Sequence, residues 1–405
     1  MKISKKNINK TLIFTGTILI IIVIFYFFKK NMTNEHFYVI NSKVNLLNMP
    51  LRYQWNTNHG YCGEVCFITA GLMLGQYFSQ YDIRAIAHCS YNKACGCDGK
   101  QIPSNCKIQS DKDKSQLLLG INDDKIAKKL HFKYEKYYSD KGQQEKYYSW
   151  IRKNLSAKNI IVSALYENFG NKFFKVWNNN KLSDKDKFGD EEYDHIILIT
   201  NITKDDLYIN DLGNYQNYLI DATDNDRYNQ QNFFDSLEYK NLEYIFKIPL
   251  KEGIKGRVDA NKNTKYPYLI PYIANYGISI SGLSDKYNNN DLIPLSIEVD
   301  KNYELPRVQE NSEDRPTAMK LKLTITVSKL TPKQNYRILK FNNITKVTNP
   351  GSNNIIVENA LNNFKSDENG EIINNPINFL AKNNTYIFND YILSSDQAIY
   401  RCYSI

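Results

Sequence analysis

A cysteine at the predicted start of a helix has the type and position of a nucleophile. Cys62 lies near the end of the segment Gln54–Cys66, where an apolar helical pattern begins. The unpaired backbone N–H groups and the dipole of a helix N-terminus favour a thiolate, which is the nucleophilic form of the side chain. Gln54, eight residues upstream, can return its side-chain amide to the same place. With the backbone N–H of Cys62, that amide would form an oxyanion hole for a carbonyl under attack.

A base for this thiol is predicted at the start of a strand. Among the five histidines, His195 alone opens an apolar run, and Asp211 ends the strand predicted after it. Neighbouring strands lie about 4.8 Å apart, so a carboxylate at Asp211 can reach the imidazole and fix its tautomer. Asn210 and Asp206 are alternatives for this orienting role. The sequence therefore predicts a Cys–His–Asp set, which requires neither a metal nor an organic cofactor.

Each of these residues also has a purely structural interpretation. Cys62 could pair with Cys66 in a disulfide or fill buried space as a small apolar residue. Cys66 lies one turn deeper in the helix, away from the N-terminal N–H groups, and is the weaker candidate nucleophile. His195 could be a hydrogen-bonded histidine at a strand end, and Gln54 a solvated loop residue. Glu64 adds a negative charge beside Cys62, which disfavours a thiolate there.

A second group of cysteines lies in a loop rich in glycine and asparagine. Its members are Cys89, Cys95, Cys97 and Cys106. In an oxidising compartment this pattern indicates a loop held by disulfides, and in a reducing one it could bind zinc, with His88 as an alternative ligand. The Cys–x–Cys pair lacks the usual ligand spacing, which favours disulfides and argues against a metal site. Cys402 stands alone near the C-terminus.

Hydrophobic patterning predicts helices followed by an antiparallel sheet in the first part of the chain. Apolar residues at helical spacing predict helices over 62–78, 122–132 and 143–155. Short apolar runs predict strands over 159–165, 195–200 and 207–211. Together these elements form an α+β domain that we expect to span residues 31–250.

The C-terminal part has the pattern of an all-β sandwich. Residues 251–265 are rich in charged and polar residues and predict a linker. Beyond them the helical period disappears, and turn residues separate short strand-like segments. These segments are 276–281, 292–299, 319–327, 336–341, 377–381 and 398–402. Such spacing is typical of a β-sandwich, which we expect over residues 266–405 and which could bind a protein or glycan ligand.

The N-terminal segment, residues 1–30, predicts a basic tail followed by a transmembrane anchor. Residues 11–28 form an uncharged run of 18 residues, long enough to cross the hydrocarbon core of a bilayer as a helix. This run ends in four aromatic residues and is followed by two lysines, where a signal peptide would have small residues for cleavage. Four lysines precede the run and two follow it, which favours a cytoplasmic N-terminus and a globular part outside the cytoplasm or in a lumen. A signal peptide cut just downstream is the alternative.

The distribution of charge argues against a nucleic-acid-binding protein. The formal net charge is +9, and six of the excess positive charges are the lysines of residues 1–30. The remaining +3 is spread over the rest of the chain, so the globular part is nearly balanced. A nucleic-acid binder would need a basic patch on its folded part.

The residues singled out above resemble the papain-like cysteine peptidases, most closely the family usually called C39-like. That family typically shows a glutamine, then Cys-Gly at a helix start, then a histidine opening a strand and an aspartate after the following strand. The matching elements here are Gln54, Cys62–Gly63, Asp194–His195 and Asn210–Asp211. His195 follows Cys62 by 133 residues, within the papain-like separation of about 130–150. The resemblance covers roughly residues 50–220.

The resemblance implies a papain-like α+β domain that cleaves peptide or amide bonds, joined here to the C-terminal sandwich and the N-terminal transmembrane helix. The substrate would be a peptide or protein, and the chain would be a single-pass membrane protein of a host or virion membrane. The alternative is a catalytically inactive papain-like scaffold whose sandwich acts as a surface binding or structural module, because a fold does not fix a function.

Overall fold

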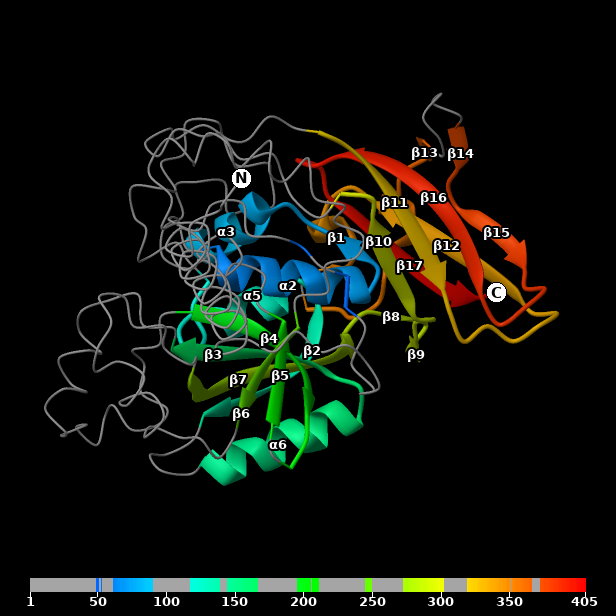
Figure 1. The fold of residues 1–405 in the computed structure, drawn as a ribbon. Helices are drawn as coiled ribbons and strands as arrows, with labels where there is room; N and C mark the ends of the chain where they lie inside the picture. The colour runs from blue at the N-terminus through cyan, green and yellow to red at the C-terminus, as the bar shows by residue number, and fades with distance from the viewer. Residues whose placement is uncertain are drawn as a thin grey trace, which may run out of the picture.

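The computed structural model describes the chain in segments (Figure 1). These are residues 49–50, 52, 61–89, 117–138, 144–166, 195–204, 206–210, 245–249, 272–301, 319–349, 351–365 and 372–405. The predicted anchor at 11–28 lies outside the described residues, as do Gln54 and Asp211. Within the described segments, no helix is both long and apolar enough to cross a bilayer.

The fold is of the α+β type and consists mostly of β-sheet, with few helices. The helices among the described residues are α2 (Cys62–Met73), α3 (Gln80–Cys89), α5 (Asp123–Lys129) and α6 (Gln144–Ser156). A six-stranded sheet has the spatial order β2 (Phe132–Tyr138), β7 (Tyr272–Leu283), β3 (Ile160–Tyr166), β4 (His195–Ile202), β5 (Asp206–Asn210) and β6 (Ile245–Pro249). Every neighbouring pair in this sheet is antiparallel.

Two further sheets form a β-sandwich beside the six-stranded sheet (Figure 1). One has the order β1 (Gln76–Tyr77), β17 (Ala398–Ser404), β12 (Asn335–Phe341) and β15 (Ile377–Leu380). The other has the order β10 (Leu295–Val299), β11 (Lys320–Val327) and β16 (Tyr386–Leu393). Small pairs are formed by β8 (Lys286–Tyr287) with β9 (Asn290–Asp291) and by β13 (Asn363–Lys365) with β14 (Ile372–Asn374). In this part of the chain, short 3₁₀ helices span Ile344–Lys346 and Val357–Asn359.

Helices cover both faces of the six-stranded sheet (Figure 1). Because side chains alternate along a strand, the apolar runs of β3 and β4 supply both faces. Ile196 and Leu198 of β4 belong to the core that includes α2, whereas Ile197 and Ile199 pack with Tyr147 and its neighbours on α6. The apolar runs within β3 and β4 are therefore buried on both faces of the sheet.

The boundary between the two predicted domains does not separate the sheets. Residues 276–281, assigned from the sequence to the sandwich over 266–405, form part of β7. That strand lies between β2 and β3 in the middle of the six-stranded sheet. Its partners lie more than 100 residues earlier in the chain, and strand pairing over such a distance leaves no local signal.

The first helix is shorter in the structure than its sequence pattern predicts. It was expected over 62–78 and ends at Met73. Gly75 then adopts a φ of +75°, and a Cβ there would lie 2.8 Å from the Cβ of Leu295, so both the turn and the packing require glycine. Past this turn the chain forms β1, which pairs with β17 at the other end of the sequence.

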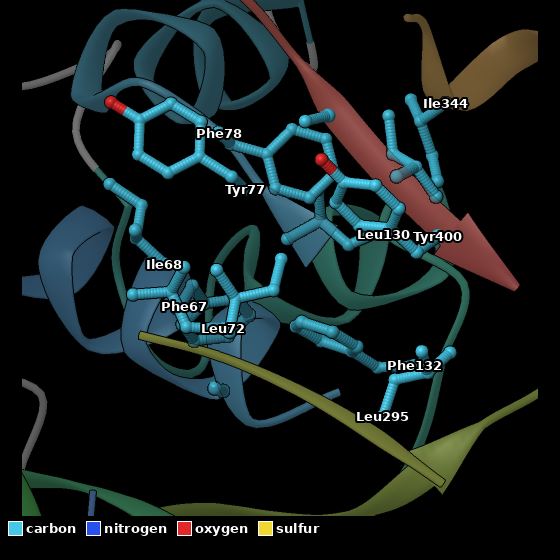
Figure 2. Close-up of a cluster of buried hydrophobic side chains, with 14 of the residues drawn as sticks. Phe67, Ile68, Leu72, Tyr77, Phe78, Leu130, Phe132, Leu295, Ile344 and Tyr400 are labelled. Carbon is cyan, nitrogen blue, oxygen red and sulfur yellow. The ribbon is translucent and has the colours of Figure 1, made fainter. Parts of the chain in front are cut away.

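One hydrophobic core joins the six-stranded sheet to the sandwich. Figure 2 shows side chains from α2, β2, β10 and β17 in a single cluster. Phe67 of α2 packs against Phe132 of β2, with ring centroids 6.1 Å apart. Leu295 and Tyr400 bring β10 and β17 of the sandwich to the same cluster. The two parts therefore share their interior, although the sequence pattern divides them into two domains.

A buried polar network crosses the same junction. Arg401 of β17 donates to Asp285 from Nε at 2.7 Å and to Gln76 from Nη2 at 2.9 Å. Asp285 also contacts the Nδ1 of His131 at 2.7 Å, and Gln76 donates to the carbonyl of Leu130 at 2.8 Å. Burial opposes ionisation of Asp285, but the charge of Arg401 and the contact with His131 outweigh it and hold the pKa of this carboxyl below its ordinary value.

Replacing Asp285 by alanine tests whether this network holds the two parts together. The variant leaves Arg401 buried without its carboxylate, which is expected to cost about 3–5 kcal/mol of unfolding free energy. Urea unfolding of the full chain should be followed by tryptophan fluorescence, because all three tryptophans precede residue 178 and report on the first part alone. We expect a single unfolding transition. Its midpoint should shift by the same amount whether unfolding is followed by tryptophan fluorescence or by circular dichroism. Asp291→Ala, at an exposed pair, is the control and should leave both curves in place. Separate transitions for the two probes would contradict the shared core.

Candidate functional site

The predicted nucleophile lies at the helix N-terminus, as the sequence indicates. Cys62 is the first residue of α2 and is partly exposed, whereas the ten residues that follow are all buried. Its backbone N–H belongs to the first turn, where no carbonyl of the same helix precedes it. Cys62, Cys66 and Cys402 are present as thiols, so the disulfide between Cys62 and Cys66 does not form. Cys402 is fully buried, which raises the pKa of its thiol to about 12.

The first turn of α2 is seated directly against the start of β4. A Cβ at Gly63 would lie 2.8 Å from Cδ2 of Leu117 and 3.0 Å from Cδ1 of Ile196, so glycine permits this close approach. The thiol of Cys66 donates to the carbonyl of Ile196 at 3.6 Å. The helix tip and the first residues of β4 therefore meet, although about 130 residues separate them in the sequence.

His195 is the first residue of β4 and is buried, with 6% of its surface exposed. Its side chain follows the alternation of the strand. Ile196 points to the core around α2, and Ile197 points to the core around α6. Alternation therefore places His195 on the face of Ile197, across the sheet from α2. The structure brings the helix tip to the backbone of this strand. For the imidazole to contact the Cys62 thiol, its ring would have to reach around the end of β4 to the other face of the sheet.

The negative charge expected beside Cys62 is neutralised by an arginine. Glu64 is fully buried and accepts from Nε of Arg84 at 2.5 Å and from the backbone N–H of Leu117 at 3.1 Å. Arg84 comes from α3, and its guanidinium lies over the ring of Tyr61 at 3.8 Å from the centroid. The other oxygen of Glu64, Oε2, is buried and has no hydrogen-bond partner among the described residues.

Burial and the neighbouring charges act in opposite directions on this arginine. Burial alone would lower the pKa of Arg84, but the charge of Glu64 raises it above its ordinary value, with further contributions from Tyr61 and Cys62. Sequence patterning did not point to Arg84, because no helix was predicted over residues 80–89.

The residues proposed to orient His195 or to stabilise the oxyanion differ in where the structure places them. Asp211 and Gln54 lie outside the described residues. Asp206 begins β5 and stands at the far end of that strand from the start of β4. Asn210 ends β5 opposite Leu198 and is buried, and its Oδ1 has no hydrogen-bond partner among the described residues. Since Leu198 belongs to the core around α2, Asn210 lies on the α2 side of the sheet.

The described residues contain no cluster of side chains that could hold a metal ion. The alternative zinc site of the cysteine loop falls almost entirely outside them, since Cys95, Cys97 and Cys106 are not described. In comparisons with known proteins, no family model, no curated protein and no solved structure matches this chain.

The pairing of Arg84 with Glu64 can be tested by removing the arginine. Arg84→Met leaves a carboxylate buried beside the helix tip, and we expect a loss of about 3–5 kcal/mol of unfolding free energy in urea titrations. The double variant Glu64→Met, Arg84→Met should recover most of that loss, because neither partner is then left unpaired. Arg337→Met, which removes an arginine with an exposed hydrogen bond, is the control. A cost below about 1 kcal/mol for the single variant would mean that the pair is solvated.

Proposed function

We propose that this chain is a membrane-anchored cysteine hydrolase of the papain-like, C39-like type that cleaves peptide or amide bonds. The observation that supports it is the seating of the first turn of α2, with Cys62 at its tip, against the start of β4, where His195 stands. A helix that presents a cysteine from its N-terminus to an antiparallel sheet is the arrangement that such chemistry requires.

The proposed reaction proceeds by acyl transfer. The Cys62 thiolate attacks the carbonyl carbon of the substrate, and the Cys62 N–H together with the side chain of Gln54 stabilises the oxyanion. His195, held in one tautomer by Asp211, gives a proton to the leaving amine and then takes one from the water that releases the acyl group. Neither a metal nor an organic cofactor takes part.

The charges around the helix tip favour this use of Cys62. The carboxylate of Glu64 would oppose a thiolate, but Arg84 pairs with it inside the protein. The guanidinium offsets that negative charge, so the pair does not oppose the helix dipole at Cys62. A buried pair has fixed geometry, so this effect persists at physiological salt.

The proposal places the hydrolase outside the cytoplasm. Residues 11–28 would anchor the chain in a host or virion membrane, with the globular part in a lumen or outside the cell. The substrate is a peptide or protein, and the sandwich would hold a protein or glycan ligand near the site. Nucleic acid has no part in the proposal.

A second candidate function follows from the alternation of side chains between the two faces of the sheet along β4. If the imidazole stays on the face of Ile197, no base reaches Cys62, and the first part of the chain is an inactive scaffold. The sandwich would then act as a surface binding or structural module, held rigidly by the core that it shares with the six-stranded sheet.

Alkylation by iodoacetamide distinguishes the two candidates. At about pH 6 an ordinary thiol is almost entirely protonated, so only a cysteine with a stabilised thiolate reacts quickly. We expect Cys62 of the full chain to be alkylated at least about tenfold faster than Cys62 of the His195→Ala variant. Peptide mapping by mass spectrometry gives both rates. The buried Cys402 is an internal reference, which should stay unreacted until the chain unfolds.

Two controls make the result specific. His36→Ala removes a histidine that has no role in the proposed reaction and should leave the alkylation rate unchanged. Cys66→Ser should also leave it unchanged, which shows that the reacting sulfur is that of Cys62. Equal, slow alkylation of Cys62 in the native chain and in His195→Ala would reject the hydrolase and favour the scaffold.

The anchor is tested by removing residues 1–30. We expect the full chain to stay with membranes after an alkaline carbonate wash, because a spanning helix resists conditions that release peripheral proteins. The shortened chain should be recovered in the soluble fraction. A full chain released by the wash would contradict a spanning segment at 11–28.

A further inference from the structure

A lysine and an aspartate face each other inside the β-sandwich. Lys340 lies on β12 of one sheet, and Asp390 lies on β16 of the other. Only 5% of Lys340 and none of Asp390 is exposed. The pair thus spans the interior between two sheets that share no backbone hydrogen bonds.

The contacts of Asp390 divide between its two oxygens. Oδ2 contacts the Nζ of Lys340 and also accepts from the hydroxyl of Tyr400. Oδ1 accepts from the backbone N–H of Tyr391 at 2.8 Å. Tyr400 is directly opposite Lys340 in the pairing of β12 with β17, so both side chains reach the carboxyl from the same sheet.

Aromatic rings surround the amine. Its Nζ lies 5.0 Å from the ring centroid of Phe364 and 5.9 Å from that of Tyr400. Phe388, two residues before Asp390 on β16, packs edge-on against Tyr400 with centroids 5.9 Å apart. Burial raises the pKa of Asp390 above its ordinary value although Lys340 lies beside it.

The other buried ion pairs described above do not offer this chemistry. Arg84 with Glu64 and Arg401 with Asp285 both use guanidinium groups, which keep their proton and are poor nucleophiles. Lys136 pairs with Asp123, but its side chain is 24% exposed to water. Lys340 with Asp390 combines an amine, a carboxyl group and exclusion of solvent.

We propose that Lys340 and Asp390 condense to an amide, an intramolecular cross-link between the two sheets of the sandwich. The geometry supplies each part of the reaction: an amine against a carboxyl group, a backbone N–H on one oxygen and a hydroxyl on the other.

The atoms balance without an oxidant or a cofactor. A proton passes from the Lys340 ammonium to the Asp390 carboxylate, which leaves a neutral amine and a carboxylic acid. The Nζ lone pair then attacks Cγ, and the negative charge that forms on Oδ1 is held by the N–H of Tyr391. The hydroxyl of Tyr400 relays a proton from Nζ to Oδ2. The Cγ–Oδ2 bond breaks, and one water molecule leaves.

The intact mass of the full chain tests the cross-link. After reduction of disulfides and denaturation, we expect the measured mass to be lower than that of the sequence by one water molecule. Trypsin does not cleave after an acylated lysine, so the peptides 338–346 and 383–401 should appear as one linked species. Fragmentation of this species should place the bond between Lys340 and Asp390.

Variants assign the loss of mass to these two residues. Lys340→Met, whose folding is verified by circular dichroism, should have the full mass of its own sequence and release the peptide 383–401 unlinked. Lys346→Met, at an exposed lysine of the same region, should retain the loss. A native chain with the full sequence mass and two separate peptides overturns the proposal, and so does an equal loss of mass in Lys340→Met. This outcome is independent of the reactivity of Cys62.

Discussion

The burial of α2 on several sides is the constraint on which the rest of the structure depends. The helix packs against β3 and β4 of the six-stranded sheet and against β10 of the sandwich. Its residues from Gly63 to Leu72 are all buried, which a helix on a protein surface does not show. Because so much of the core is built around it, the position of Cys62 is fixed by packing from two parts of the chain. A site at the tip of such a helix is held rigidly, and its surroundings are set by residues distant in sequence.

Local patterns predicted the elements of the fold more successfully than their partners. The apolar runs at 159–165 and 195–200 became β3 and β4, and the third predicted helix became α6. β7 was recognised as a strand, but it was assigned to the sandwich because nothing within its own residues shows that it pairs with β2 and β3. The strands β10, β11, β12, β15 and β17 were recognised by the same rule, whereas β16 and the short strands β8, β9, β13 and β14 were missed. Periodicity reports the burial of a segment, and pairing depends on contacts that only the whole chain defines.

In the candidate site, too, local sequence predicted the elements but not the contacts between them. The helix N-terminus at Cys62 and the strand start at His195 follow from sequence, and the structure brings these two backbones together. The face to which His195 belongs depends on the register of β4 and on which helix covers each side of the sheet. Glu64 was correctly identified as a charge near the thiol, but its neutralisation by Arg84 depends on a helix with no clear pattern. Position along the chain was therefore predictable, and side-chain environment was not.

The two-residue strand β1 has a consequence for the order in which the protein can mature. Gln76 pairs with Ile399, and the N–H of Tyr400 donates to the carbonyl of Gly75 at 2.8 Å. The segment that follows α2 thus pairs with a strand more than 300 residues later in the chain. Its apolar residues cannot be covered before β17 has been synthesised, and closure across so long a loop is slow. A chain shortened before β17 would therefore also deprive the first part of residues that fill its interior.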